Sequence, residues 1–209
     1  MLQRSTGIVL DVKWDPVTKT FRDFSRNHHT ITNHNVTPVR GRSGVAGYFN
    51  GDNAYLDCGN DPSLDITDAI TIEAWVKPDT LSQDSIVVCQ DVPSSSGKIA
   101  IGIYTTENKI LLGVTYNPVG LFGISSYLTA GQWQHWVEVY DITNDTIKFY
   151  LDGKEQTLID VYERFYTNGG TLRIGARETE RYFNGAIDEV RIYNRALSAD
   201  EIKTHYQPE

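Results

Sequence analysis

Short runs of β-forming residues separated by turn residues limit most strongly what this chain can fold into. The runs are rich in Val, Ile, Tyr, Phe, Trp and Thr, and Gly, Asn, Asp and Pro stand between them, the pattern of strands joined by tight connections. The clearest runs are Ile8–Val12, Ala46–Asn50, Ala54–Cys58, Ala69–Lys77, Ser85–Gln90, Lys98–Tyr104, Lys109–Tyr116, Trp133–Tyr140, Thr146–Leu151, Thr171–Ile174 and Gly185–Tyr193. We therefore expect an all-β fold, and 209 residues fit one β-sandwich domain over residues 1–209.

Alternation within two of these runs assigns side chains to faces. In the run at residues 70–76 one face carries Ile70, Ile72, Ala74 and Val76 and the other carries Thr71, Glu73 and Trp75, and we expect one of the two faces to be core. In Trp133–Tyr140 both faces carry a tryptophan. This second run is therefore predicted to be a central strand covered on both sides.

Local turn and cap residues specify the remaining elements. A hairpin is predicted around Asn144–Asp145, and a tighter one at Asp152–Gly153, because Asp-Gly favours a two-residue reversal. Ser198 with Glu201 three residues later forms a capping box, which predicts a short helical turn over residues 198–206. Residues 13–45 show poor periodicity, and we interpret them as a long loop over the sandwich.

Charge and hydropathy restrict partners and location. The formal net charge of −8 and the lack of a Lys/Arg run longer than two argue against nucleic acid as a partner. The first residues lack the apolar stretch of about 7–15 residues that a signal peptide needs. No window approaches the ~18 consecutive apolar residues of a membrane span, so no membrane insertion is expected. Cys58 and Cys89 are too few for a disulfide framework and indicate two buried thiols, with a bridge as the alternative.

Four ordered blocks resemble one known family. Residues 183–202, FNGAIDEVRIYNRALSADEI, resemble the terminal signature of the laminin-G-like jelly-roll family in the concanavalin-like superfamily. The other blocks are Gly47–Leu56, Ala69–Pro78, and Gly131–Val137 continuing to Ile147–Lys154. The resemblance spans about residues 8–206 and implies a two-sheet antiparallel β-sandwich of the concanavalin-like jelly-roll type. The fold serves lectins, glycosidases, adhesion modules, toxin domains and viral attachment proteins, so function must come from the site.

The same resemblance implies a structural calcium near the edge of the sandwich. Asp188 corresponds to the family's carboxylate in the last strand. Calcium takes 6–8 hard oxygen ligands, and the turn at residues 50–53 supplies them if it folds beside Asp188. The predicted metal ligands are Asp188, Asn50, Gly51 and Asp52, with Asp11 and Asp15 as weaker additions. The family carboxylate of the first turn is an asparagine here, at Asn50.

Aromatic residues near loops are the candidate ligand contacts, because loops carry most binding residues and aromatic faces stack on sugars or partner surfaces. They are Tyr104, Tyr116, Phe122, Tyr127, Tyr166 and Tyr182. Trp133, His135 and Trp136 are instead interpreted as packed residues of the central strand.

No catalytic constellation is found. Paired carboxylates at alternate strand positions, which glycosidases of related fold use, are missing. Gly-x-Ser-x-Gly, His-Glu-x-x-His and phosphate-binding glycine loops are also absent. We therefore predict a non-catalytic binding or adhesion module that recognises a carbohydrate or a glycosylated or protein surface. The alternative is a structural or attachment component of a virion or extracellular assembly, engaged in self-assembly or bound to a carrier protein. Both place the protein outside a cell or on a virion surface.

Overall fold

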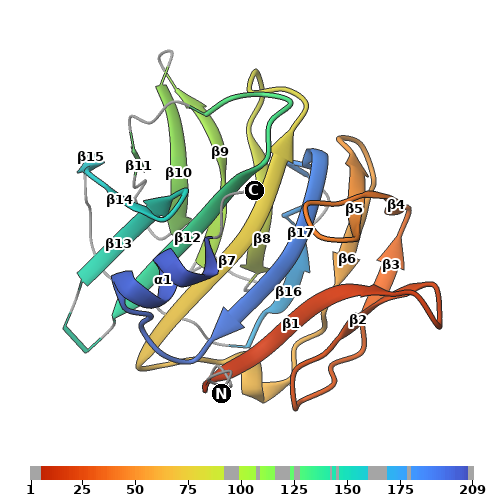
Figure 1. The fold of residues 1–209 in the computed structure, drawn as a ribbon, viewed down its shortest axis with the longest axis horizontal. Helices are drawn as coiled ribbons and strands as arrows, with labels where there is room; N and C mark the ends of the chain where they lie inside the picture. The colour runs from red at the N-terminus through yellow and green to blue at the C-terminus, as the bar shows by residue number, and fades with distance from the viewer. Residues whose placement is uncertain are drawn as a thin grey trace.

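The computed structural model describes residues 6–91, 99–106, 109–115, 123–124, 128–141, 143–144, 146–159, 169–177 and 180–206. Two large antiparallel sheets lie face to face in this part of the chain (Figure 1). This arrangement confirms the predicted β-sandwich.

The nine-stranded sheet has the order β14-β13-β12-β7-β17-β1-β2, with β5 also paired to β17 and β4 to β5. Its strands are β1 (Ile8–Asp15), β2 (Thr20–Asp23), β4 (Thr37–Arg40), β5 (Val45–Asn50), β7 (Ala69–Pro78), β12 (Gln134–Asp141), β13 (Thr146–Leu151), β14 (Lys154–Gln156) and β17 (Asn184–Tyr193).

The six-stranded sheet has the order β10-β9-β8-β16-β6-β3. Its strands are β3 (Thr32–His34), β6 (Tyr55–Asp57), β8 (Ser85–Asp91), β9 (Ile99–Thr106), β10 (Lys109–Thr115) and β16 (Thr171–Ile174). Two short strands, β11 (Gly123–Ile124) and β15 (Leu158–Ile159), pair separately. The remaining elements are the 3-10 turn η1 (Pro62–Leu64) and the helix α1 (Ala199–His205).

The main core lies between the two sheets and follows the predicted alternation. Ile70, Ile72, Ala74 and Val76 all lie in this core, together with Trp136 from the neighbouring strand. Strand β12 lies between β7 and β13 and is buried on both faces, as predicted for a central strand. Residues 71, 73 and 75 therefore project to the outer side of the nine-stranded sheet.

Helix α1 covers part of that outer side, in front of the nine-stranded sheet (Figure 1). Ile202 of the helix packs with five residues of the sheet and of the segment before the helix: Val137, Val139, Tyr150, Tyr193 and Leu197. The predicted capping box is present, since Ser198 Oγ accepts from Glu201 N and the Glu201 carboxylate accepts from Ser198 N. The helix begins where the sequence predicts it.

The interpretation of residues 13–45 as a loop is wrong for several stretches. Strand β1 continues to Asp15, and three short strands follow, β2, β3 and β4. In β2, Phe21 and Asp23 are buried while Thr20 and Arg22 are exposed. Strands of three or four residues contain too few alternations to give a clear periodic signal, which explains why the sequence pattern missed them.

Two local predictions agree with the structure. Asp152 and Gly153 have positive φ angles of 51° and 72° and join β13 to β14 as a tight hairpin. Cys58 and Cys89 are both buried thiols that are not joined in a disulfide, which confirms the thiol prediction over the disulfide.

Candidate functional site

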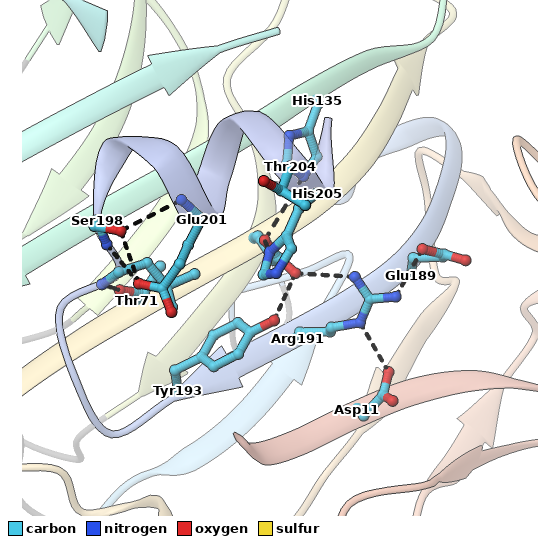
Figure 2. Close-up of polar contacts among 12 residues, drawn as sticks. Asp11, Thr71, His135, Glu189, Arg191, Tyr193, Ser198, Glu201, Thr204 and His205 are labelled. Atoms are coloured by element: carbon cyan, nitrogen blue, oxygen red, sulfur yellow. Dashed lines mark hydrogen bonds and ion pairs between the residues drawn. The ribbon is translucent and has the colours of Figure 1, made fainter. Parts of the chain in front are cut away.

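A buried carboxylate, Glu73, organises the outer side of the nine-stranded sheet. Its side chain is fully buried. Glu73 Oε1 accepts hydrogen bonds from Arg191 Nη1 at 2.9 Å and from Tyr193 Oη at 2.8 Å, and Oε2 contacts His205 Nδ1 at 2.9 Å (Figure 2). Glu73 thereby ties together β7, β17 and helix α1.

The partners of Glu73 keep it ionised in spite of its burial. Burial by itself would raise the pKa of Glu73, but the His205 hydrogen bond and the Arg191 charge lower it to about 2. Arg191 also contacts Glu189 Oε2 at 2.8 Å and Asp11 Oδ1 at 3.4 Å. Burial opposes the Arg191 charge, yet the three carboxylates together raise its pKa. The cluster is therefore a charged network that holds its shape at neutral pH.

A stack of rings extends this network along the sheet. The Trp75 ring lies 5.0 Å from that of His135 and 5.7 Å from that of Tyr206, centroid to centroid. The Arg42 guanidinium lies 4.6 Å from the Trp75 ring centroid, a cation–π distance. Burial lowers the pKa of His135 to about 4, so its imidazole is neutral at neutral pH. His135 is packed, as predicted, 1% exposed.

A groove of about 360 Å³ opens between the network and the solvent. It is lined by Arg42, Ser43, Trp75, Glu189, Arg191, Thr204 and His205. These residues come from the loop before β5, from β7 and β17, and from α1. The lining combines guanidinium, hydroxyl, carboxylate and imidazole groups beside an indole, which suits a ligand rich in hydroxyl groups.

Asp188 positions the loop that forms one rim of this groove. Its Oδ2 accepts from Ser43 N at 3.1 Å, and its Oδ1 accepts from Glu189 N at 2.9 Å. A Cβ at Gly41 would overlap Asp188 Oδ2, so glycine is required for this close approach. Burial raises the pKa of Asp188 although these N–H groups oppose the shift. The carboxylate of Asp188 thus acts as an anchor for the rim.

The turn at residues 50–53 lies away from Asp188. Asn50 pairs with Asn184 across β5 and β17, and Asp188 is four residues farther along β17, about 13 Å at 3.3 Å per residue. Asn50 Oδ1 accepts from the backbone N–H groups of Asp52 and Asn53, and Gly51 N donates to Phe183 O.

These residues do not fit a shared calcium ion. Asp188 is surrounded by N–H donors, whereas calcium requires oxygen ligands. Asp11 and Asp15, the weaker additions, are paired with Lys13 and Arg191 and with Arg22. Within the described part of the chain, no three His, Cys, Asp or Glu side chains are grouped to hold a metal.

Among the six aromatic candidates, Tyr182 can be placed. It is partly exposed, and its ring lies 6.4 Å from that of Tyr55 on the other sheet. Tyr104 belongs to β9 by its backbone, and its side chain lies outside the described part. Four candidates lie outside the described residues altogether: Tyr116, Phe122, Tyr127 and Tyr166.

Sequence reasoning did not identify Glu73, Arg191 or His205 as site residues. A signal was present, because Glu73 is the one charged residue in the run at residues 70–76. A charged residue in the middle of a central strand needs a partner. The partners lie 118 and 132 residues away in sequence, so the sequence pattern could not name them.

Comparison with known families identifies the superfamily to which the chain belongs. The profile described as concanavalin A-like lectin/glucanases superfamily matches residues 50–203. The protein is therefore a member of this superfamily, as its sequence blocks indicated. No curated protein matches the chain.

Solved structures share the fold at low sequence identity. Domain 4 of AbnA, a GH43 extracellular arabinanase from Geobacillus stearothermophilus in complex with arabinotriose, has 20% identity and a TM-score of 0.75, with 96% of this chain and 100% of that chain covered. The binding domain of Paraclostridial Mosquitocidal Protein 1 has 16% identity and a TM-score of 0.70, with 96% and 52% covered. The binding domain of botulinum neurotoxin DC in complex with rat synaptotagmin II has 15% identity and a TM-score of 0.67, with 96% and 51% covered.

The chain thus spans about half the length of the two toxin binding domains. Among the described helices, none has the length and apolar character needed to cross a membrane.

Proposed function

We propose that this protein is a non-catalytic binding module that takes a carbohydrate in the groove beside Trp75. The observation that carries the proposal is the groove itself, a hollow of about 360 Å³ whose polar lining is held in place by the Glu73 network. A rigid set of donors and acceptors loses little conformational entropy when a ligand binds. Sugar hydroxyls both donate and accept, so they match a lining that offers both.

The residues that line the groove offer different hydrogen-bonding groups. Glu189 offers a carboxylate acceptor, and the Ser43 hydroxyl donates or accepts. The Thr204 hydroxyl donates to Asp200 O and can accept from a ligand. His205 is held by Glu73 through Nδ1, which turns Nε2 away from Glu73. The domain of the arabinanase that shares this fold is in complex with arabinotriose, which supports a saccharide as the ligand class.

The lining does not favour catalysis. Most glycoside hydrolases use two carboxyl groups on either side of the scissile bond. Among the described residues that line the groove, Glu189 is the one with a carboxyl group. Glu73 is buried beneath Arg191, Tyr193 and His205, where it has a structural role.

A blocking substitution tests the proposal. Ser43→Trp places an indole on the exposed rim of the groove, and Val17→Trp is the matched control, since Val17 is 88% exposed and lies outside the groove. The labelled proteins are applied to an array of immobilised glycans that includes arabinotriose. We expect the wild type and the control to bind the same glycans and Ser43→Trp to lose at least tenfold in signal on the glycans that bind in the groove. Equal binding by all three proteins would exclude the groove as the binding site.

A role in assembly is a second candidate, favoured by apolar side chains at the edge of the nine-stranded sheet. Val17 and Phe24 flank the edge strand β2 and are 88% and 49% exposed. Exposed apolar residues beside an edge strand are suited to contact another chain. Sedimentation velocity over a hundredfold concentration range tests self-association. A single monomer peak for both the wild type and Phe24→Ser would rule it out.

A further inference from the structure

We infer that the opposite sheet carries a second saccharide-binding surface, made by His34, Tyr55, Tyr182 and Arg173. The inference rests on the proposed function in its choice of ligand class, and it concerns a separate face of the molecule. Tyr55 and Arg173 belong to β6 and β16 of the six-stranded sheet, whereas the groove belongs to the nine-stranded sheet. We call these four residues the tyrosine surface.

Four side chains from two distant stretches of the sequence converge here. The His34 ring stacks on Tyr55 with centroids 4.3 Å apart and an interplanar angle of 8°. The Tyr182 ring lies 6.4 Å from Tyr55 at 45°, and the Arg173 guanidinium lies 5.8 Å from the Tyr55 centroid. All four side chains are partly exposed.

The tyrosine surface faces outward from the sandwich. Leu56, the residue after Tyr55, is 2% exposed and lies in the core between the sheets. Successive strand residues point to opposite faces, so Tyr55 and Asp57 project away from the core. Asp57 Oδ2 lies 3.8 Å from Arg173 Nε, which adds an acceptor and a donor beside the rings.

The backbone that carries these rings is fixed on several sides. Tyr55 pairs with His34 across β6 and β3, and Asp57 pairs with Arg173 across β6 and β16. Tyr182 is held through its neighbours, since Arg181 O accepts from Ile86 N and Phe183 N donates to Gly175 O. Phe183 is fully buried and packs edge-on against Phe49. The rings are therefore presented by rigid elements, as a binding surface requires.

The chemistry of the tyrosine surface fits a saccharide. The C–H faces of a sugar ring pack on aromatic rings, and its hydroxyls pair with planar charged groups such as Arg173 and Asp57. A cluster of rings that lie at different angles, with an ion pair at its side, suits a sugar unit of an extended chain. Together with the groove, it would give one monomer two saccharide-binding faces on opposite sheets, enough to link two glycan-bearing particles.

The test compares three proteins with the wild type on the same glycan array and in a particle assay. Ser43→Trp blocks the groove, a Tyr55→Ser and Tyr182→Ser double variant removes the tyrosine surface, and Tyr48→Ser is the control, a partly exposed tyrosine on the other sheet. The thermal midpoint of each variant is measured first. A Tyr182→Ser single variant replaces the double variant if the latter does not fold. Beads coated with the strongest glycan of the array then report whether a monomer cross-links them.

We expect Ser43→Trp to keep its binding signal on some of the glycans, and the double variant to lose at least tenfold in signal on those same glycans. We expect the wild type and Tyr48→Ser to cross-link the beads, and Ser43→Trp and the double variant not to cross-link them. If Ser43→Trp binds no glycan on the array, the tyrosine surface is overturned and the groove proposal stands. If the double variant alone binds no glycan, the groove proposal fails and the tyrosine surface stands. A wild type that binds no glycan overturns both.

Discussion

Two glutamates in neighbouring strands of one sheet have opposite environments. Glu73 of β7 and Glu138 of β12 lie one register position apart, since Glu73 pairs with Val137 and Ile72 with Glu138. Both are buried, at 0% and 4% exposure. Glu73 projects to the outer side and meets Arg191, Tyr193 and His205, whereas Glu138 projects into the sandwich, and its Oε2 has no hydrogen-bond partner in the described structure.

The difference shows that partners, more than burial, decide the charge of a carboxyl group. The partners of Glu73 lower its pKa to about 2, while burial raises the pKa of Glu138 to about 8. At neutral pH the outer glutamate is an anion that organises the groove, and the inner one is mostly a neutral acid within the core. The predictions below test this contrast, from the largest expected effect to the smallest.

Removal of the Glu73 charge is expected to cause the largest loss. Glu73→Gln breaks an ion pair whose carboxylate is fully buried and leaves the partly buried Arg191 less compensated, which costs about 3–5 kcal/mol. The folded pKa of Glu73 is below its unfolded value, so its contribution is present above pH ~4.5 and is lost as the pH falls towards ~2. Urea unfolding at several pH values measures both effects.

The matched control for this change is Glu189→Gln. Glu189 also pairs with Arg191 but its side chain is 23% exposed, so its loss is expected to cost less than about 1 kcal/mol. Equal losses from the two substitutions would contradict the special role of the buried partner.

Glu138→Gln is expected to increase stability at high pH. The folded pKa of Glu138 lies above its unfolded value, so the wild type loses stability as the pH rises from ~4.5 to ~8. The amide does not ionise, and the variant should gain on the order of 3–4 kcal/mol relative to the wild type between pH 5 and 8. If the unfolding free energies of the wild type and of Glu138→Gln changed in parallel with pH, Glu138 would have a partner that stabilises its charge.

A smaller effect is expected at the start of the helix that covers Glu73. Ser198→Ala removes the hydroxyl that accepts from Glu201 N and should cost about 1 kcal/mol. Ser198→Asp keeps a capping acceptor and should retain most of the stability. Thermal unfolding compares the three proteins, and an aspartate variant as weak as the alanine variant would argue against the capping role.

Calcium is expected to have the smallest effect, because Asp188 and the turn at residues 50–53 are apart and Asp188 is occupied by N–H donors. A ligand that binds the folded state raises the unfolding midpoint in proportion to RT ln(1 + [L]/Kd). We expect the same midpoint with excess calcium and with chelator. A rise that Asp188→Ala abolishes would restore the calcium site predicted from sequence.

The sequence predicted most of the framework because its determinants are local. Alternation at residues 70–76 separated the two faces of β7, Asp152–Gly153 located a hairpin, and Ser198 with Glu201 located the helix. Residues 13–45 were misread because β2, β3 and β4 have three or four residues each and lie toward the edges of their sheets. Periodicity is informative only over longer runs.

By itself the sequence thus determined the sandwich, the two alternating faces of β7 and the capped helix α1, since each depends on residues close together in the chain. Tertiary structure alone decided that Glu73, Arg191 and His205 meet, that Asp188 anchors the rim of the groove, and that Tyr55 and Tyr182 share a surface on the other sheet. Those contacts join residues more than a hundred positions apart in the sequence. Successive residues of a strand point to opposite faces, so a shift of one residue decides which side chain faces the core and which faces the site.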